Sequence, residues 1–109
     1  MKFPEYWTNV DKLNRLQRMV LLHSIIYYEF DESVITDDYY NKLARLLARK
    51  VKQYKDKPIF KDTMYWYVFE DYTDGSSGYY LLRRLKTKDY KYLRLLATHI
   101  IKRAKENRE

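Results

Sequence analysis

Residues that interrupt regular structure are almost absent from this sequence. Its 109 residues include two glycines, Gly75 and Gly78, and two prolines, Pro4 and Pro58. Glycine weakens a helix because its backbone is too free, and proline because it lacks an N–H and clashes with the preceding turn. A chain that nearly lacks both residues favours helices joined by short turns. We therefore predict an all-α fold.

The length and composition predict one compact domain over residues 1–109. A single domain commonly contains roughly 100–200 residues. Hydrophobic residues make up 46% of the chain and aromatic residues 17%, with 13 tyrosines among them. Disordered chains are poor in aromatic residues, so this composition indicates a folded, aromatic-rich core. We expect four to five helices around that core.

The same composition narrows the cellular context. The chain contains no cysteine, so disulfides, thiol catalysis and cysteine-ligated zinc are excluded. No apolar run approaches the roughly 20 residues that a membrane-spanning helix needs. The N-terminus lacks the apolar stretch and small-residue cleavage site of a signal peptide. We expect a cytoplasmic protein with no membrane contact.

Two predicted helices form a helix-loop-helix unit over residues 9–56. Apolar residues recur at helical spacing up to Phe30, and Asn9 is the expected N-cap of the first helix. Thr36 is the expected N-cap of the second helix, because the acidic pair Asp37 and Asp38 follows it and suits the positive end of the helix dipole. The expected apolar stripe of the second helix is Tyr40, Leu43, Leu47, Val51 and Tyr54.

The remaining chain, residues 59–107, is expected to form a second helical part. Its segment Met64–Tyr72 is rich in β-favouring residues, but both alternating sets of side chains are apolar. A lone strand would also lack a partner. We favour a buried helix here and retain a strand or short hairpin as the alternative.

Turn and cap residues divide the rest of this part. Asp74-Gly75 predicts a turn, and Ser76 or Ser77 is expected to cap a short helix that runs through Leu85. Thr87 is expected to cap the last helix. The core stripe of that helix is expected to consist of Leu93, Leu96, Ala97, Ile100, Ile101 and Ala104.

The net charge of +7 is unevenly distributed. Acidic residues gather in residues 29–40 and 62–74, and basic residues in 45–61 and 83–109. Lysine and arginine can neutralise phosphates, and interleaved tyrosines can stack on bases. The preferred function is therefore binding of nucleic acid or a protein partner through basic helices, with a merely solvated surface as the alternative. The candidate contacts are Arg45, Arg49, Lys52, Lys91, Arg94, Lys102 and Lys105.

Sequence motifs of enzymes are missing. The chain has no GxGxxG, P-loop, HExxH or GxSxG pattern. His23 and His99 have no carboxylate at ligand spacing, so we expect neither a metal site nor a catalytic residue. In DGSSG, the backbone N–H groups of Ser76, Ser77 and Gly78 could hold an anion, but a capped turn is the favoured interpretation.

The sequence LLHSIIYYEFDESVITDDYYNKLARLL, residues 21–47, resembles a known family. It is similar to the small N-terminal helical subdomain of NAD-dependent bacterial DNA ligases. That subdomain contains a helix with Tyr-His, a short Asp-containing loop, and Ile-x-Asp-x-x-Tyr-Asp-x-Leu at the start of a second helix. In the family, these side chains clasp the nicotinamide mononucleotide half of NAD.

On this resemblance, Tyr27, Asp37 and Tyr40 match the family pattern. Tyr28 stands where the family has histidine, and Asn41 where it has the final aspartate. The resemblance implies a site for NAD or nicotinamide mononucleotide, with the two matching tyrosines on the nicotinamide ring. Asp37 and Asn41 would bond its amide or ribose.

The rest of a ligase is missing, including the KxDG nucleophile motif. The resemblance therefore implies a small, stand-alone, non-catalytic protein of the sort that bacteriophages encode, acting as an accessory or host-modulating factor. A nicotinamide-nucleotide binding module is the first alternative to partner binding through basic helices. Inhibition of a host enzyme or defence system through the acidic loop Glu29–Asp38 is the second.

Overall fold

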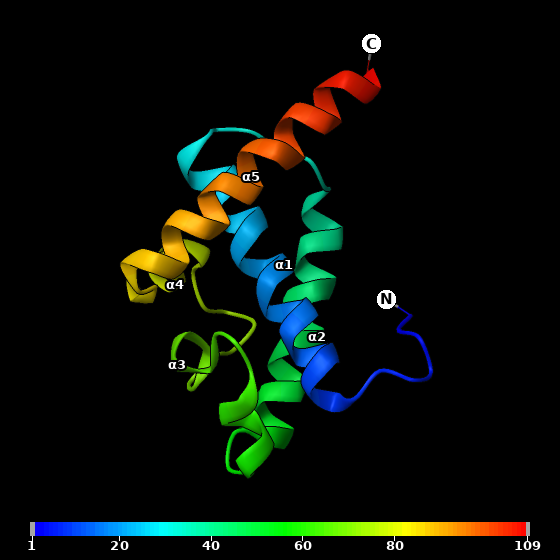
Figure 1. Cartoon of the computed structure of the whole chain (residues 1–109), viewed down its shortest axis with the longest axis vertical. Helices are drawn as coiled ribbons and strands as arrows, with labels where there is room; N and C mark the ends of the chain where they lie inside the picture. The colour runs from blue at the N-terminus through cyan, green and yellow to red at the C-terminus, as the bar shows by residue number, and fades with distance from the viewer. Residues whose placement is uncertain (1, 109) are drawn as a thin grey trace.

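This computed structural model describes residues 2–108, which contain five α-helices and one short 3₁₀ helix joined by loops and turns (Figure 1). No strand occurs in these residues. The predicted all-α fold of four to five helices is confirmed. In chain order the elements are α1 (Asn9–Glu29), α2 (Asp37–Tyr54), η1 (Pro58–Asp62), α3 (Trp66–Phe69), α4 (Gly78–Arg84) and α5 (Thr87–Arg108).

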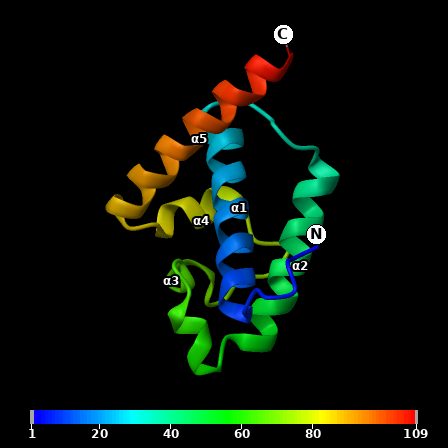
Figure 2. The same ribbon diagram turned by 45° about the vertical axis from the view of Figure 1, so that its right-hand side comes forward.

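The central element is α1, which packs against α2, α4 and α5. Figure 2 shows α2 and α5 on different sides of α1. The second half of α1 is apolar almost all round, and five of its residues are nearly or fully buried: Val20, Leu21, Leu22, Ile25 and Ile26. Full burial of such a side chain contributes roughly 1.5–3 kcal/mol, so this stretch organises the core.

The first two helices begin at polar caps. Thr8, rather than Asn9, is the N-cap of α1: its hydroxyl accepts from the N–H of Asp11, whose carboxylate accepts from the N–H of Thr8. This reciprocal pair is a capping box, and the prediction of Asn9 is wrong because Asn9 already lies inside the helix. The predicted cap of α2 is confirmed, since Thr36 accepts from the N–H of Tyr39 at 3.1 Å.

The β-favouring segment forms one helical turn, α3, so the strand alternative is wrong. The helix is nevertheless shorter than the prediction. A buried polar network holds the chain before α3 in a non-helical conformation: the amide nitrogen of Gln17 donates to the Thr63 hydroxyl, and the N–H of Tyr65 donates to the Gln17 amide oxygen. Gln17 is fully buried, and sequence periodicity carries no sign of such a long-range pair.

The later caps agree with the prediction only in part: Ser77 is at the N-cap position of α4, whereas Thr87 is not at that of α5. Ser77 precedes α4 but its side chain makes no capping hydrogen bond, and the Ser76 hydroxyl instead accepts from the N–H of Thr73 within the turn. Thr87 is the first residue of α5, and the Lys86 carbonyl accepts from the N–H of Tyr90. The prediction of Thr87 as cap is therefore wrong by one residue.

The predicted apolar stripes lie largely on the core. In α2, Tyr54 and the three aliphatic residues of its stripe are buried, whereas Tyr40 is half-buried. In α5, Leu93 and Ala97 are buried, and the other large apolar residues of its stripe are partly buried against the core. The C-terminal end of α5 projects beyond the other helices (Figure 1), which explains its lower burial.

Candidate functional site

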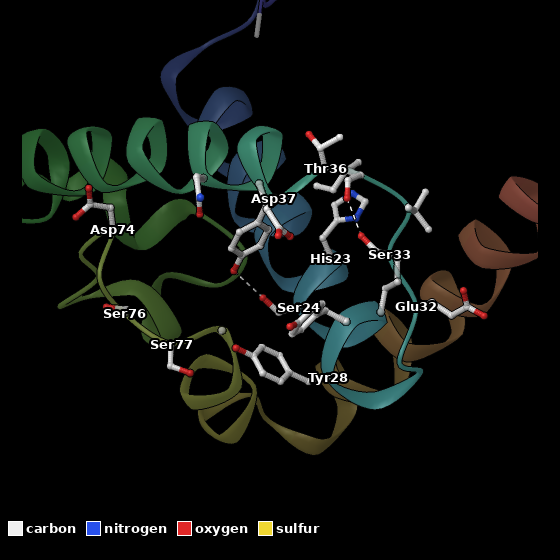
Figure 3. Close-up of a pocket in the computed structure, with 17 residues that line it drawn as sticks. His23, Ser24, Tyr28, Glu32, Ser33, Thr36, Asp37, Asp74, Ser76 and Ser77 are labelled. Carbon is white, nitrogen blue, oxygen red and sulfur yellow. Dashed lines mark hydrogen bonds between the residues drawn. The ribbon is translucent and has the colours of Figure 1, made fainter.

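A cavity of about 360 Å³ lies between the C-terminal half of α1, the loop 30–36, the start of α2 and the turn 74–78 (Figure 3). Small-molecule sites commonly occupy roughly 300–1,000 Å³, so this cavity is large enough for a small ligand. We call it the pocket. Its walls come from segments that are distant in sequence.

The pocket brings together every residue predicted from the ligase resemblance. Two are at the end of α1 and three are in the first turns of α2. The turn before α4 adds Ser76, Ser77 and Gly78, which the sequence had suggested separately as backbone donors. The five predicted residues are Tyr27, Tyr28, Asp37, Tyr40 and Asn41.

Tyr40 is fixed by a short chain of hydrogen bonds. Its hydroxyl lies 2.9 Å from the Ser24 hydroxyl, which donates to the Val20 carbonyl at 2.7 Å. Since the Ser24 proton is thus used, Tyr40 donates to Ser24. Burial raises the pKa of Tyr40. Tyr40 is therefore neutral near pH 7.

Gly78 lets α4 approach this pair closely. A Cβ at position 78 would lie 2.6 Å from the Ser24 hydroxyl oxygen and 3.1 Å from the Tyr40 hydroxyl oxygen. Such contacts are too short for ordinary packing, so only glycine fits without displacing the two hydroxyls. The turn before α4 is thus packed directly against the pocket wall.

Tyr27 and Tyr28 form the rim of the pocket. Their side chains are 57% and 47% exposed. The two rings meet edge to face with centroids 4.9 Å apart, and Tyr28 meets Tyr79 of α4 in the same manner at 5.9 Å. Such pairs hold aromatic rings in defined orientations, and about half of each side chain remains accessible to a ligand.

His23 also lines the pocket, although the sequence did not suggest a role for it there. Its Nδ1 atom is buried and has no hydrogen-bond partner among residues 2–108. Burial, with a contribution from the charge of Arg15, lowers the pKa of His23, so the ring is neutral near pH 7. The available signal was spacing: His23 precedes Tyr27 by four residues and shares its helix face.

The charge of the pocket walls is negative. Glu32, Asp37 and Asp74 line the pocket, whereas its lining includes no lysine or arginine from the described chain. Lys105 of α5 lies 3.0 Å from the Glu32 carboxylate. Asp37 stands in the first turn of α2, where the helix dipole stabilises a carboxylate.

The acidic loop 29–38 is partly engaged within the protein. Besides the contact of Glu32 with Lys105, Glu29 accepts a hydrogen bond from the Tyr90 hydroxyl. Asp31 adopts a positive φ of 50°, the left-handed conformation that lets the chain turn sharply after α1. Two of the carboxylates proposed for contact with a host enzyme therefore already have partners.

The basic residues of α2 line a second cavity, which we call the groove. Arg45, Arg49 and Lys52, three of the predicted contacts, lie there together with Lys55. Their spacing of three and four residues places them on one face of the helix. The groove measures about 720 Å³. Its other wall includes the acidic residues Glu70, Asp71 and Asp74.

The basic residues of α5 lie elsewhere. Because α1 separates α5 from α2 (Figure 2), the structure does not gather all seven predicted contacts into one surface. The guanidinium of Arg94 lies 4.5 Å from the Phe30 ring centroid, and Lys105 contacts Glu32. Lys91 and Lys102 are exposed.

Residues 2–108 lack two kinds of feature. No three histidine, aspartate or glutamate side chains in this part of the chain lie close enough together to hold a metal ion. None of its helices combines the length and the apolar character that crossing a membrane requires.

Comparison of the chain with protein-family models, curated proteins and solved structures finds no match. The similarity to the ligase subdomain therefore stays a prediction from the residues named above.

Proposed function

We propose that the protein is a non-catalytic binding module that holds a nicotinamide nucleoside or nucleotide in the pocket. One observation carries this proposal. Five residues selected only for their resemblance to a nicotinamide clasp, on two different helices, line the same cavity. The cavity also has the size of a small-molecule site.

The side chains would divide the work of recognition. The exposed faces of Tyr27 and Tyr28 can stack on the nicotinamide ring. The unpartnered Nδ1 of His23 and the amide of Asn41 can bond the carboxamide. Asp37 can accept a hydrogen bond from a ribose hydroxyl. Tyr40, held by Ser24, forms a fixed wall between these groups.

The proposal excludes nucleotide transfer for a chemical reason. The chain lacks the KxDG motif that supplies a nucleophilic lysine in ligases, and no lysine lines the pocket within residues 2–108. A bound ligand would thus be recognised but not converted. Such a protein suits the accessory or host-modulating role that the ligase resemblance implies.

Isothermal titration calorimetry with NAD, nicotinamide mononucleotide and nicotinamide riboside tests the proposal. We expect saturable heat with at least one of these compounds, and about fivefold weaker binding after Tyr27→Ala because an aromatic contact worth roughly 1 kcal/mol is lost. Tyr6→Ala is the matched control, since Tyr6 is 85% exposed and does not line the pocket. Absence of heat with all three compounds at millimolar concentration contradicts the proposal.

The second candidate is binding of nucleic acid through the basic face of α2. The observation that favours it is the continuous row of four cations along the groove. A polyanion contacting them would release counterions, so its affinity would fall steeply with salt. The acidic wall opposite α2 would repel phosphates, and for this reason the pocket carries the stronger proposal.

Fluorescence anisotropy with labelled single-stranded DNA and RNA, measured from about 50 to 200 mM salt, tests this candidate. We expect the logarithm of the affinity to fall linearly with the logarithm of the salt concentration. Equal retention of the protein on DNA, RNA and neutral resin at low salt contradicts it. A pull-down from host lysate then asks whether an acidic protein is the partner instead.

A further inference from the structure

We propose that the pocket selects a planar organic cation without a phosphate, of the N-substituted pyridinium class to which nicotinamide riboside belongs. This inference rests on the proposed function and specifies the ligand class of the same site. It differs from what the ligase resemblance implies, because nicotinamide mononucleotide carries a phosphate. The inference rests on the negative charge of the pocket walls and on aromatic rings that have no lysine or arginine over them.

The carboxylates provide the first argument. Asp37 of α2 and Asp74 of the turn before α4 both line the pocket, although Figure 3 shows the Asp74 carboxylate turned away from that of Asp37. Among the described side chains, neither of these two carboxylates has an ion-pair partner. Of the three carboxylates that line the pocket, only Glu32 has one, which is Lys105. Two uncompensated negative charges in the lining of one cavity attract a cation and repel an anion.

The absence of a phosphate anchor is the second argument. Sites that hold phosphate usually present arginine or lysine to it, and no such residue of the described chain lines the pocket. The positive end of α2 is already occupied by Asp37 and Asp38. A phosphate entering the pocket would therefore lose its water and meet carboxylates instead of cations, with only the backbone of the turn before α4 as a source of donors.

The aromatic rings provide the third argument. A tyrosine face attracts a cation placed over it. Elsewhere in the protein, five aromatic rings each have a lysine or arginine over the face: those of Phe30, Tyr54, Trp66, Tyr67 and Tyr80. Within residues 2–108, no lysine or arginine occupies the rings of Tyr27, Tyr28 or Tyr40 in this way. The pocket thus combines partly exposed aromatic rings that have no cation over them with unpaired carboxylates, the two features that bind a pyridinium ring.

Titration calorimetry with four compounds tests the inference. Nicotinamide riboside is compared with nicotinamide mononucleotide to isolate the phosphate, and 1-methylnicotinamide with nicotinamide to isolate the positive charge. We expect the first member of each pair to bind at least roughly tenfold more tightly, because like charges facing each other in a site are strongly disfavoured. Equal or tighter binding of the mononucleotide overturns this inference and leaves the proposed function standing. Equal affinity for 1-methylnicotinamide and nicotinamide also overturns it.

Two variants locate the selectivity. Asp37→Asn and Asp74→Asn each remove one charge with little change of shape, and each is expected to reduce the preference for the riboside to about threefold or less. Asp62→Asn is the control, because Asp62 is an exposed residue of η1 that does not line the pocket. An unchanged preference in both pocket variants overturns the inference. If none of the four compounds binds the unaltered protein, the proposed function fails together with it.

Discussion

The pocket and the groove both use α2 and share Asp74, yet they present opposite charges along that helix. The first turns of α2 give Asp37 and Asn41 to the pocket, whereas the later turns give Arg49 and Lys52 to the groove. This order agrees with the helix dipole, which favours negative charge at the N-terminus and positive charge at the C-terminus. One helix can therefore serve two sites of different preference without weakening itself.

The two cavities also differ in how their walls are held. The pocket depends on buried or half-buried groups, with Tyr40, Ser24 and Gly78 in close contact. The acidic wall of the groove depends on the salt bridge between Asp71 and Arg84, in which the Asp71 side chain is 69% exposed. Exposed ion pairs contribute little and are screened by salt. Packing changes should thus disturb the pocket, and salt should disturb the groove.

The largest effect is expected from Gly78→Ala. The new methyl group would displace the Ser24 and Tyr40 hydroxyls, which should lower the free energy of unfolding by about 1–3 kcal/mol. Urea unfolding measures this loss. Gly75→Ala is the matched control, because the nearest atom to a Cβ there lies 3.9 Å away. Equal stability of the two variants would show that the close contact at position 78 does not hold the pocket wall.

The N-caps of α1 and α2 should contribute nearly equally to the free energy of unfolding. Thr8→Ala and Thr36→Ala each remove the cap of a long helix and should each lower the unfolding free energy by about 1 kcal/mol. Only Thr36 lines the pocket. The affinity for nicotinamide riboside, measured by calorimetric titration, should therefore decrease in Thr36→Ala alone. Equal weakening in both variants would mean that ligand binding reports general stability instead of pocket geometry.

A smaller effect is expected at the groove. If nucleic acid binds there, log affinity plotted against log salt concentration has a negative slope. The double variant Arg49→Gln with Lys52→Gln should make this slope shallower by roughly 0.7–0.9 for each lost phosphate contact. The control is Lys91→Gln with Lys102→Gln on α5, which removes the same charge from another surface. The groove is not the binding surface if the α5 variant reduces the slope by the same amount.

The smallest effect concerns pH. Because burial lowers the pKa of His23 from 6.5, the unfolded chain binds more protons than the folded one just below that pH. Stability contributed by the neutral ring is thus complete above pH 6.5 and decreases as the solution is acidified. Urea unfolding at pH 7.5 and 5.5 measures how far the free energy of unfolding falls on acidification. This fall should be smaller for His23→Gln than for the unaltered chain. His99→Gln, at an exposed position of α5, should not change the decrease.

Local sequence predicted the parts of the fold that depend on nearby residues. The helix-loop-helix unit, the cap at Thr36 and the buried residues of α2 follow from spacing and capping chemistry, which act within a few turns. The same local order places Tyr27 and Asp37 at the two ends of one short loop. Five residues of the pocket could thus be named from residues 21–47 alone.

The remaining features of the fold and of the pocket depend on contacts between residues that are distant in sequence. The turn 74–78 reaches the pocket because Gly78 fits against Ser24, and the segment before α3 is held by Gln17, 46 residues away from Thr63. Periodicity does not encode such partners. His23 was a foreseeable member of the pocket by its spacing from Tyr27, but its unpartnered Nδ1 became visible only in the folded protein.

By itself, the sequence determined an all-helical chain, the N-terminal cap of α2, and the residue types available to the pocket. Only the tertiary structure decided that the basic faces of α2 and α5 lie apart and that Asp37 and Asp74 line one cavity. The physical reason is that helix formation depends on hydrogen bonds within a few residues. Charge placement in space depends instead on which apolar faces pack around α1, a choice made by the whole chain at once.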